Sequence, residues 1–247
     1  MSHFIRHDML TPVVATEIEF YLFGSQGRDL MDFWQAVQSF SLPIVKYEKE
    51  KGFEQFEVAM QPTANIEKVI SNTERLKALI TALASDNGMR ASFDAKPLEN
   101  DVGSGLHIHV HLEDENGNNV FYKDDEQMSD ELAFAIGGLL ANMKNDLPIF
   151  VPTEESKKRF VAGSNVPMTV SWGANNRSCA VRLPIKPHDK KHIEHRVSGA
   201  DADVAAVIGA ILKAIEQGIE QRIYPHQPQI YGDASLPMYG LPPLFLE

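Results

Sequence analysis

A stretch of alternating histidines, GSGLHIHVHL at residues 103–112, has the residue types and spacing of a chemical site. Side chains alternate between the two faces of a strand, so His107, His109 and His111 are expected on one face, with apolar residues on the other. The glycines before them let the backbone approach a ligand closely. Neutral imidazoles on one face can bind a metal ion or a phosphate, although a half-exposed strand rich in histidine would show the same pattern.

Carboxylates recur near the N-terminus at strand-like spacing. Glu17 and Glu19 lie two apart in the apolar run VVATEIEFYLF, where an unpaired carboxylate is costly. Glu50, Glu54 and Glu57 follow in EKGFEQFE. Two carboxylates about 4 Å apart repel by about 4 kcal/mol at an effective dielectric of about 20, so a cluster implies bound cations or raised pKa values. Several carboxylates beside one histidine suit Mg²⁺ or Mn²⁺ better than Zn²⁺.

Arginines gather in the second half of the sequence, at Arg159, Arg177, Arg182 and Arg196. Arginine binds carboxylate and phosphate oxygens through two parallel hydrogen bonds, although a surface salt bridge is the default role of any single one. Metal ligands followed by arginines match the needs of phosphoryl transfer, in which cations stabilise the moving phosphoryl group. The sequence has no GxxxxGK[ST] loop and no kinase glycine-rich loop, so these familiar nucleotide-binding folds are excluded.

The composition excludes several classes of function. The 247 residues include 23 Lys and Arg against 34 Asp and Glu, and the formal charge of −11 argues against a nucleic-acid or acidic-membrane partner. A hydrophobic fraction of 43% is ordinary for a protein with an apolar core. The single cysteine, Cys179, can form no internal disulfide, and the sequence has neither a leader pattern nor a long apolar run. We therefore expect a cytoplasmic protein without a membrane span.

The elements that must position these residues alternate between strands and long helices. The helix 129–145 is expected to end before Pro148, and the two last strands to form a hairpin-like pair around Asn175 and Asn176. Strands that pair in this way, with helices between them, predict an α+β domain with a curved, largely antiparallel sheet backed by helices. The pattern predicts strands at 13–23, 42–48, 55–60, 90–95, 106–112, 168–174 and 179–184, and helices at 30–40, 64–84, 129–145 and 201–222.

Several segments, in this order, resemble the catalytic domain of glutamine synthetases. They are EIEFYLF (17–23), EKGFEQFE (50–57), ASFDAKP and GSGLHIHVHL (91–97 and 103–112), KRFVAGSNVPMTVSWGANNRSCAVRLP (158–184) and IEHRVSGADADVAAVIGAIL (193–212). The wording around HRVSGADAD and SWGANNRSCAVR is most similar to the branch of γ-glutamylpolyamine synthetases, such as the γ-glutamylputrescine synthetases. The resemblance implies the fold of that catalytic domain over residues 13–243.

The resemblance also implies two adjacent divalent metals, Mg²⁺ or Mn²⁺, with ATP as co-substrate. The implied reaction is attack of the glutamate γ-carboxylate on ATP, followed by displacement of phosphate from γ-glutamyl phosphate by an amine. By motif position, the implied ligands are Glu19, Glu50 and Glu57 for one metal, and Glu17, His107 and Glu194 for the other, nearer the nucleotide phosphates.

The remaining implied roles concern the substrates. Arg159 and Arg196 match arginines that bind glutamate, and the backbone of Gly103 would face the glutamate amino group. Arg177 and Arg182 match arginines that face the transferred phosphate, so their implied roles are catalytic and nucleotide-binding. The implied role of Arg159 is also catalytic. His109 and His111 would lie beside the nucleotide.

The chain also departs from the family pattern. Family members carry a small N-terminal β-grasp domain that completes the neighbouring subunit's active site. Here residues 1–12 are expected as an extension before a single domain that is shorter than the family's at both ends. Asn165 stands where glutamine-forming members have a flap glutamate that helps take the ammonium proton, which is compatible with an amine other than ammonia. His111 replaces a serine near the nucleotide, His192 replaces a basic nucleotide contact, and Val102 replaces an asparagine that helps hold glutamate.

Three hypotheses follow. The first is a compact γ-glutamyl ligase that uses ATP, glutamate and an amine, which retention of all the matched metal ligands and arginines favours. The second is a catalytically impaired relative that binds ATP and metal, or that acts as a regulatory partner of a full-length homologue, which Asn165 and the short ends favour. The third is a kinase-like or ATP-hydrolysing activity that stops at the acyl phosphate. Assembly as a homo-oligomer, or with a full-length homologue, is compatible with the first two.

Overall fold

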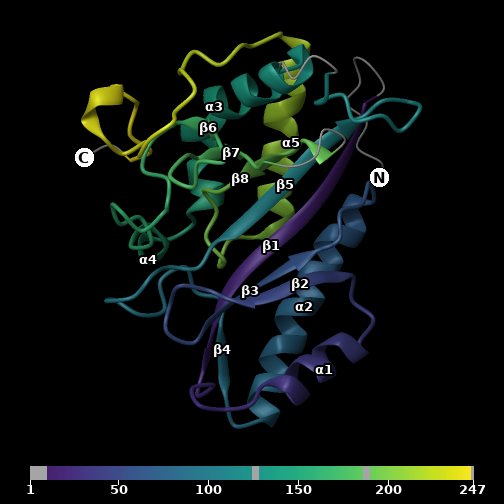
Figure 1. Ribbon diagram of the computed structural model, residues 1–247, viewed down its shortest axis with the longest axis vertical. Coiled ribbons are helices and arrows are strands. Elements are labelled where there is room, and N and C mark those ends of the chain that lie inside the picture. Colours follow the sequence, from purple (N-terminus) through teal and green to yellow (C-terminus); the bar gives the residue numbers. More distant parts are fainter. Residues whose placement is uncertain (1–9, 124–127, 186–189, 246–247) are drawn as a thin grey trace.

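The apolar run near the N-terminus forms the long strand β1 (Thr11–Phe23), which crosses the centre of a single twisted sheet (Figure 1). The computed structural model describes residues 10–123, 128–185 and 190–245. The strand order is β2-β3-β1-β5-β8-β7-β6, and β4 pairs with the end of β1. The remaining strands are β2 (Ile44–Lys49), β3 (Gln55–Met60), β4 (Arg90–Ser92), β5 (Leu106–Glu113), β6 (Trp172–Ala174), β7 (Val181–Leu183) and β8 (Ile193–His195).

The helices divide between the two ends of the sheet. In Figure 1, α1 and α2 lie at the end that carries β2, β3 and β4, whereas α3 and α5 lie at the end that carries β6, β7 and β8. Each long helix begins at a side-chain cap, in which Asn65, Ser129 or Asp203 accepts a hydrogen bond from a backbone N–H of the first turn. The helices are α1 (Met31–Ser39), α2 (Ile66–Asp86), α3 (Asp130–Phe150), α4 (Glu154–Lys157) and α5 (Val204–Glu220), with a short 3₁₀ turn at Pro237–Tyr239.

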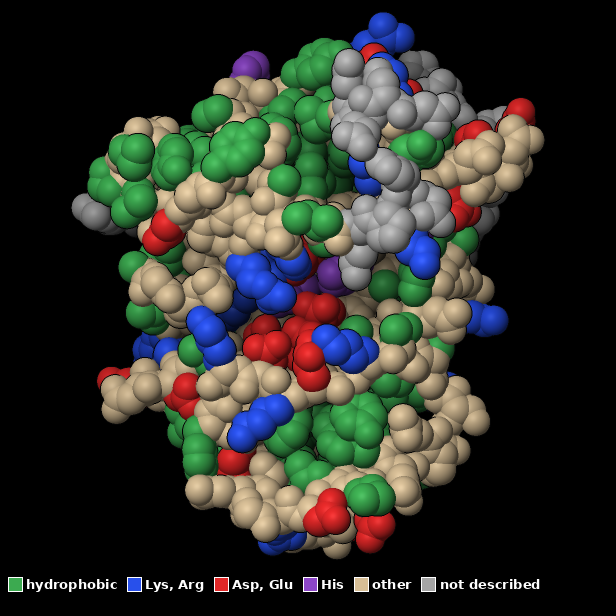
Figure 2. Space-filling view, viewed as in Figure 1, with side chains coloured by type: hydrophobic (Ala, Val, Ile, Leu, Met, Phe, Trp, Pro, Cys, Tyr) green, Lys and Arg blue, Asp and Glu red, His purple; other side chains and the backbone are tan. Residues whose placement is uncertain are grey.

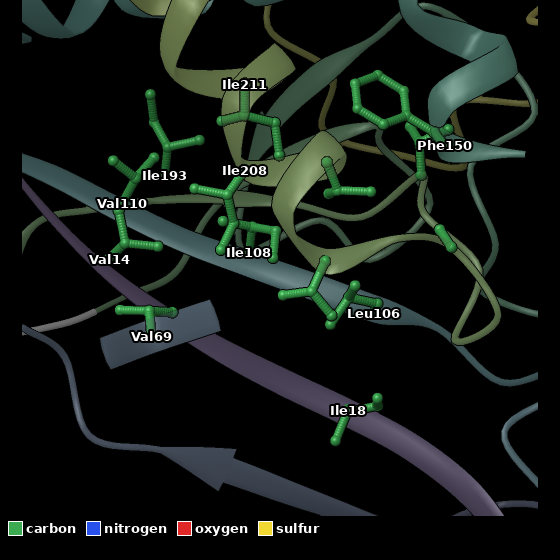
Figure 3. Close-up of a cluster of buried hydrophobic side chains, with 14 of the residues drawn as sticks. Val14, Ile18, Val69, Leu106, Ile108, Val110, Phe150, Ile193, Ile208 and Ile211 are labelled. Carbon is green, nitrogen blue, oxygen red and sulfur yellow. The ribbon is translucent and has the colours of Figure 1, made fainter. Parts of the chain in front are cut away.

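Strand alternation gives the sheet one apolar and one polar face. Ile18 and Phe20 are fully buried, whereas Glu17 and Glu19 between them point to the opposite face and keep some exposure. On the apolar face, Ile208 and Ile211 of α5 pack over Ile108 of β5 (Figure 3). Among the described residues, the long helices pack on the apolar face, and the opposite face carries polar side chains.

Two predictions about elements are wrong. Pro148 does not end the third helix, because α3 continues to Phe150. Proline near the end of a helix removes only one backbone hydrogen bond, and the buried Phe150 ring, 4.5 Å from the ring of His195, keeps the last turn in the core. The N–H of Val151 still donates to the carbonyl of Leu147.

The second wrong prediction concerns the expected pair 168–174 and 179–184. Only Trp172–Ala174 and Val181–Leu183 are strands, and they pair in parallel, not as a hairpin. Asn175 takes a left-handed conformation with φ 48°, and the connection then folds back so that β7 runs in the same direction as β6. β7 also pairs with β8, which joins this part to the main sheet. The sheet as a whole is therefore largely antiparallel, as predicted.

Within the described ranges, no helix combines the length and the apolar character that a membrane span requires.

Candidate active site

The register of the strands brings the predicted carboxylates and histidines together on the polar face. Glu17 of β1 lies opposite His107 of β5, and Glu19 lies opposite Glu57 of β3. On the other side of β5, Glu194 of the neighbouring strand β8 lies opposite His109. Figure 2 shows acidic and basic side chains gathered in a hollow across the middle of this face. A pocket of about 360 Å³ occupies the region, and its lining includes Glu19, Glu50, His107, Arg159, Arg177 and Arg196.

Glu17, His107 and Glu194 form one group whose ligand atoms all lie within 4.8 Å of one another. His107 Nδ1 is 3.0 Å from Glu17 Oε1 and 3.8 Å from Glu194 Oε1. His109 Nε2 lies 3.6 Å from the other oxygen of Glu17. Burial would raise the pKa of Glu17, but hydrogen bonds from His107 and His109 hold it well below its usual range. The structure thus brings together one predicted ligand set from three strands.

The second predicted set, Glu19, Glu50 and Glu57, is arranged differently. Glu19 and Glu57 group with His107, whereas Glu50 groups with Glu57 and with Glu48 of β2. Glu57 and His107 therefore lie between neighbouring clusters, each within the same 4.8 Å limit. Glu48 was not predicted, although its place opposite Glu57 follows from the pairing of β2 with β3.

The electrostatics of these groups fit bound divalent cations. Burial, followed by repulsion from Glu17 and Glu19, raises the pKa of Glu57 to about 10. Burial and the nearby Glu19 raise the pKa of Glu50 as well. The Nε2 atom of the buried His107 has no hydrogen-bond partner among the described residues. Hard oxygen donors beside a single imidazole match the ligand preferences of Mg²⁺ and Mn²⁺, and such an ion would remove the repulsion that raises these pKa values.

Two arginines hold Glu194 in place. Arg182 Nη1 donates to one oxygen of its carboxylate and Arg196 Nη1 donates to the other. Burial alone would raise the pKa of Glu194, but Arg196 and the other cations around it hold this pKa at about 2. Arg182 also donates to Asn175 Oδ1 at 2.7 Å. Glu194 is therefore a fully buried carboxylate that stays ionised at neutral pH.

Arg159 is buried beside the glycine segment. Its Nη1 donates to the carbonyl of Val197 at 2.9 Å, while its Nε has no partner among the described residues. Burial lowers the pKa of its guanidinium to about 10, so it remains charged at neutral pH. A Cβ atom at Gly103 would lie 2.5 Å from the Arg159 side chain, and one at Gly105 would lie 2.6 Å from it. Glycine is thus needed here for close packing against a buried cation.

The other predicted residues lie around this centre. Arg177 lines the pocket, and Arg196 Nε donates to the Arg177 carbonyl at 3.3 Å. His109 Nδ1 lies 3.1 Å from His192 Nε2. His111 lies further along β5, where its Nε2 is 3.1 Å from Glu113 Oε1. Both histidines are on the polar face of the sheet, as the alternation predicts.

Glu54 does not share the role considered for its neighbours. Its carboxylate accepts a hydrogen bond from the Gln26 backbone N–H at 2.6 Å and a longer one from Ser25 Oγ at 3.4 Å. It adopts a positive φ of 61° and is buried. Glu54 therefore holds the turn after β1, and it belongs to none of the candidate metal groups among the described residues.

Comparisons with known proteins point to one family. Residues 28–235 match the family described as "Glutamine synthetase, catalytic domain", a range that holds every predicted site residue except Glu17 and Glu19. The chain is 31% identical to the γ-glutamylputrescine synthetase of Escherichia coli K12, over 96% of the chain and 57% of that protein. It is 31% identical to a glutamine synthetase of Pyrococcus abyssi, over 77% of the chain and 48% of that protein.

A solved structure shares the fold. It is described as a "GmaS/ADP complex", and it superposes with a TM-score of 0.82 at 23% identity, covering 95% of this chain and 60% of that one. The chain thus spans between about half and three fifths of the length of these relatives. The chain belongs to the glutamine synthetase family, and it corresponds to the catalytic domain of that family.

Proposed function

We propose that this protein is a γ-glutamyl ligase that couples ATP cleavage to amide formation between the glutamate γ-carboxylate and an amine. The observation that carries the proposal is the combination, on one polar face, of adjacent carboxylate–histidine groups and four arginines. Acid-rich groups suit divalent cations, and arginines suit the carboxylates and phosphates of the substrates. Two relatives, a γ-glutamylputrescine synthetase and a glutamine synthetase, support the same reaction class.

Two ions of Mg²⁺ or Mn²⁺ would be held by Glu17, His107 and Glu194 and by the group around Glu57. When bound, they would neutralise the repulsion between ATP and the carboxylate that attacks it. The residues that would complete the second group are Glu19, Glu48 and Glu50.

The arginines would bind the substrates. Arg159 and Arg196 would hold glutamate, with Gly103 beside its amino group. Arg177 and Arg182 would face the transferred phosphate, and His109 and His111 would contact the nucleotide.

The reaction proceeds in two balanced steps. A γ-carboxylate oxygen of glutamate forms a bond to the γ-phosphorus of ATP, and the bond between that phosphorus and the bridging oxygen breaks to release ADP. The amine nitrogen then attacks the acyl carbon of γ-glutamyl phosphate, phosphate leaves, and the nitrogen loses a proton. Phosphorylation is needed because a free carboxylate is a poor acyl donor, and the arginines stabilise charge that develops on the phosphoryl oxygens.

ADP release with Mg²⁺ or Mn²⁺, ATP and L-glutamate, measured against ammonia, methylamine, ethanolamine and putrescine, tests the proposal. We expect release that requires both glutamate and one of the amines. Release with glutamate alone would indicate an activity that ends at the acyl phosphate.

A second candidate, a catalytically impaired relative that binds ATP and metal, is favoured by one residue. Asn165 lines the pocket where a base would accept the amine proton, and an amide side chain cannot accept it. Binding of ATP and metal without turnover on any amine would support this candidate over the ligase.

A further inference from the structure

Asp201 is an acidic residue beside the site to which the proposed reaction gives no role. One of its oxygens, Oδ2, accepts a hydrogen bond from Ser156 Oγ at 2.5 Å. The other, Oδ1, is buried and has no hydrogen-bond partner among the described residues. A Cβ atom at Gly199 would lie 2.4 Å from Oδ1, so glycine is needed there to make room for this oxygen. A buried carboxylate oxygen without a donor is costly, and its position calls for an explanation in its surroundings.

Ser156 connects Asp201 to the turn that carries Arg159. Ser156 is buried in α4, and its backbone carbonyl accepts a hydrogen bond from the Arg159 N–H at 3.2 Å. Because an ionised carboxylate only accepts, the Ser156 hydroxyl donates to Asp201, and the Thr153 hydroxyl, 2.7 Å away, then donates to Ser156. The Thr153 oxygen in turn accepts from the Ser156 backbone N–H at 3.0 Å. The Asp201 carboxylate therefore sets the direction of a chain of hydrogen bonds in the helix that leads to Arg159.

The segment that contains Asp201 is anchored independently of α4. The carbonyl of Ala200 accepts a hydrogen bond from Lys77 Nζ of α2 at 3.1 Å, and the N–H of Ala200 belongs to a hydrogen bond with the glycine segment before β5. Arg159 reaches this segment through the carbonyl of Val197 at 2.9 Å. Asp201 reaches back from the same segment to α4. Two contacts that run in opposite directions thus fix the position of Arg159.

Asp201 is also a counter-charge for Arg159. The hydrogen bonds of the buried Arg159 guanidinium go to backbone carbonyls, and no carboxylate in the described part of the chain forms an ion pair with it. Glu19 and Asp201 are the anions whose charges favour its ionised form. In the proposed function Glu19 shares its charge with a metal ion, so Asp201 is the anion that remains. Because Asp201 attracts the guanidinium without a direct hydrogen bond, N–H groups of Arg159 stay available to a substrate carboxylate.

We propose that Asp201 is a positioning residue for Arg159, which it aligns through Ser156 and through its charge so that the guanidinium can bind the carboxylate of an amino-acid substrate. The proposal rests on the proposed function, in which Arg159 holds glutamate. Arg159 is among the described residues that line the pocket, whereas Asp201 is not. Asp201 therefore acts on the substrate only through Arg159, and it should affect the binding of glutamate and leave the binding of ATP unchanged.

Asp201→Asn and Ser156→Ala separate the two parts of this role. The first removes the charge and keeps an oxygen that can accept from Ser156, whereas the second keeps the charge and removes the hydrogen bond. In the ADP-release assay, we expect Asp201→Asn to raise the KM for glutamate by about tenfold, which corresponds to about 1.4 kcal/mol, with kcat and the KM for ATP little changed. Ser156→Ala should raise the same KM by a smaller factor. The double variant should raise it by less than the product of the two factors, because both substitutions act on Arg159.

Asp203→Asn is the matched control. Asp203 is an exposed acid in the same segment, its side chain caps α5, and asparagine caps a helix as well as aspartate does. This variant removes the same charge and should keep the KM for glutamate. A purely structural role of Asp201 would lower the melting temperature and the fraction of active protein, and hence kcat, without a selective rise in the KM for glutamate. If Asp201→Asn does not fold, Ser156→Ala decides, and an unchanged KM in that variant overturns the proposal.

Glutamate binding without turnover separates failure of this inference from failure of the proposed function. An unchanged KM for glutamate in both variants, with turnover intact, overturns the role of Asp201 while the ligase function stands. If no amine supports ADP release, the ligase proposal fails, and the role of Asp201 is then tested by the rise in melting temperature that L-glutamate produces. A rise that is lost in Asp201→Asn and kept in Asp203→Asn supports the role. No rise in the unmutated protein overturns it.

Discussion

Glu57 is a carboxyl group of the acidic site that is costly to ionise. It is buried, it lies opposite Glu19 on one side and Glu48 on the other, and its pKa is raised to about 10 by burial and by its acidic neighbours. Glu194 has the opposite environment, since Arg196 and Arg182 hold its pKa at about 2. The two glutamates thus differ in charge state because their neighbours differ. A cation bound at Glu57 would stabilise its ionised carboxylate, as the arginines stabilise that of Glu194.

Glu57→Gln should stabilise the metal-free protein at neutral pH. The ordinary pKa of 4.5 applies to Glu57 in the unfolded chain, and the folded value is about 10, so the folded state binds one more proton between these values. The stability contributed by this group is therefore complete below pH 4.5 and is lost as the pH rises towards 10. Glutamine cannot titrate, and the variant should gain stability on the order of 1 kcal/mol or more, since a shift of one pKa unit is worth about that much.

Denaturant unfolding of the metal-free protein from pH 5 to pH 9 measures this difference. The unmutated protein should lose stability with rising pH more steeply than Glu57→Gln, and Mn²⁺ should flatten its profile because metal binding displaces the proton. Parallel profiles for the two proteins would contradict the assignment of the raised pKa to Glu57.

At the residue level, alternation within strands was enough to predict much of the site. The motif EIE places Glu17 and Glu19 on one face of their strand, and the alternating histidines place His107 on one face of theirs. That the two faces coincide follows from the register of β1 on β5. Glu48 could not be found in this way, because only the register of β2 on β3 sets it beside Glu57. The sequence groups Glu54 with the other acidic residues, but its carboxylate does not join them. Its backbone has a positive φ, and its carboxylate binds the turn after β1.

At the level of elements, most strand and helix positions follow from periodicity, and the errors occur where tertiary contacts decide. The core contact of Phe150 outweighs the helix-ending tendency of Pro148. The parallel pairing of β6 and β7 depends on the conformation of Asn175 and on hydrogen bonds from Asn176 to the segment near Ile230. Neither the bond partners nor that segment's position can be derived from local sequence patterns.

The packing of α3 on α5 depends on glycines that allow the two backbones to approach closely. A Cβ atom at Gly138 would lie 2.1 Å from the Ala214 carbonyl oxygen, too close for any adjustment of a side chain to relieve. Gly138→Ala should therefore destabilise the protein by about 1–3 kcal/mol, the usual cost of overpacking. Gly209→Ala on α5 is the matched control, since a Cβ atom there meets nothing within 4 Å.

Thermal unfolding of the two variants checks this contact. Gly209→Ala should be neutral or more stable by up to about 1 kcal/mol, because alanine favours helix over glycine. Equal melting temperatures for the two variants would show that α3 and α5 do not pack as closely as the structure places them.

At the level of the whole molecule, the site joins parts of the chain that are distant in sequence. β1, β2 and β3 supply Glu17, Glu57 and their acidic neighbours, whereas β5 and β8 supply His107 and Glu194. Helices α2 and α5 back these two regions on the other face of the same sheet. A cation bound across the polar face would therefore link neighbouring strands of the central sheet that come from both halves of the chain, and its effect on stability should be global and not confined to one loop.

Mn²⁺ should accordingly protect both regions of the sheet together. A ligand that binds only the folded state at one hundred times its Kd adds about 2.7 kcal/mol of stability, so the melting temperature should rise. Hydrogen exchange should slow in β3 and in β8, although the two strands are far apart in sequence. His107→Ala should weaken both effects, because His107 belongs to the group with Glu17 and Glu194 and to the group with Glu19 and Glu57. Protection of β3 alone, or an equal response in His107→Ala, would show that the ion does not bridge the clusters through this histidine.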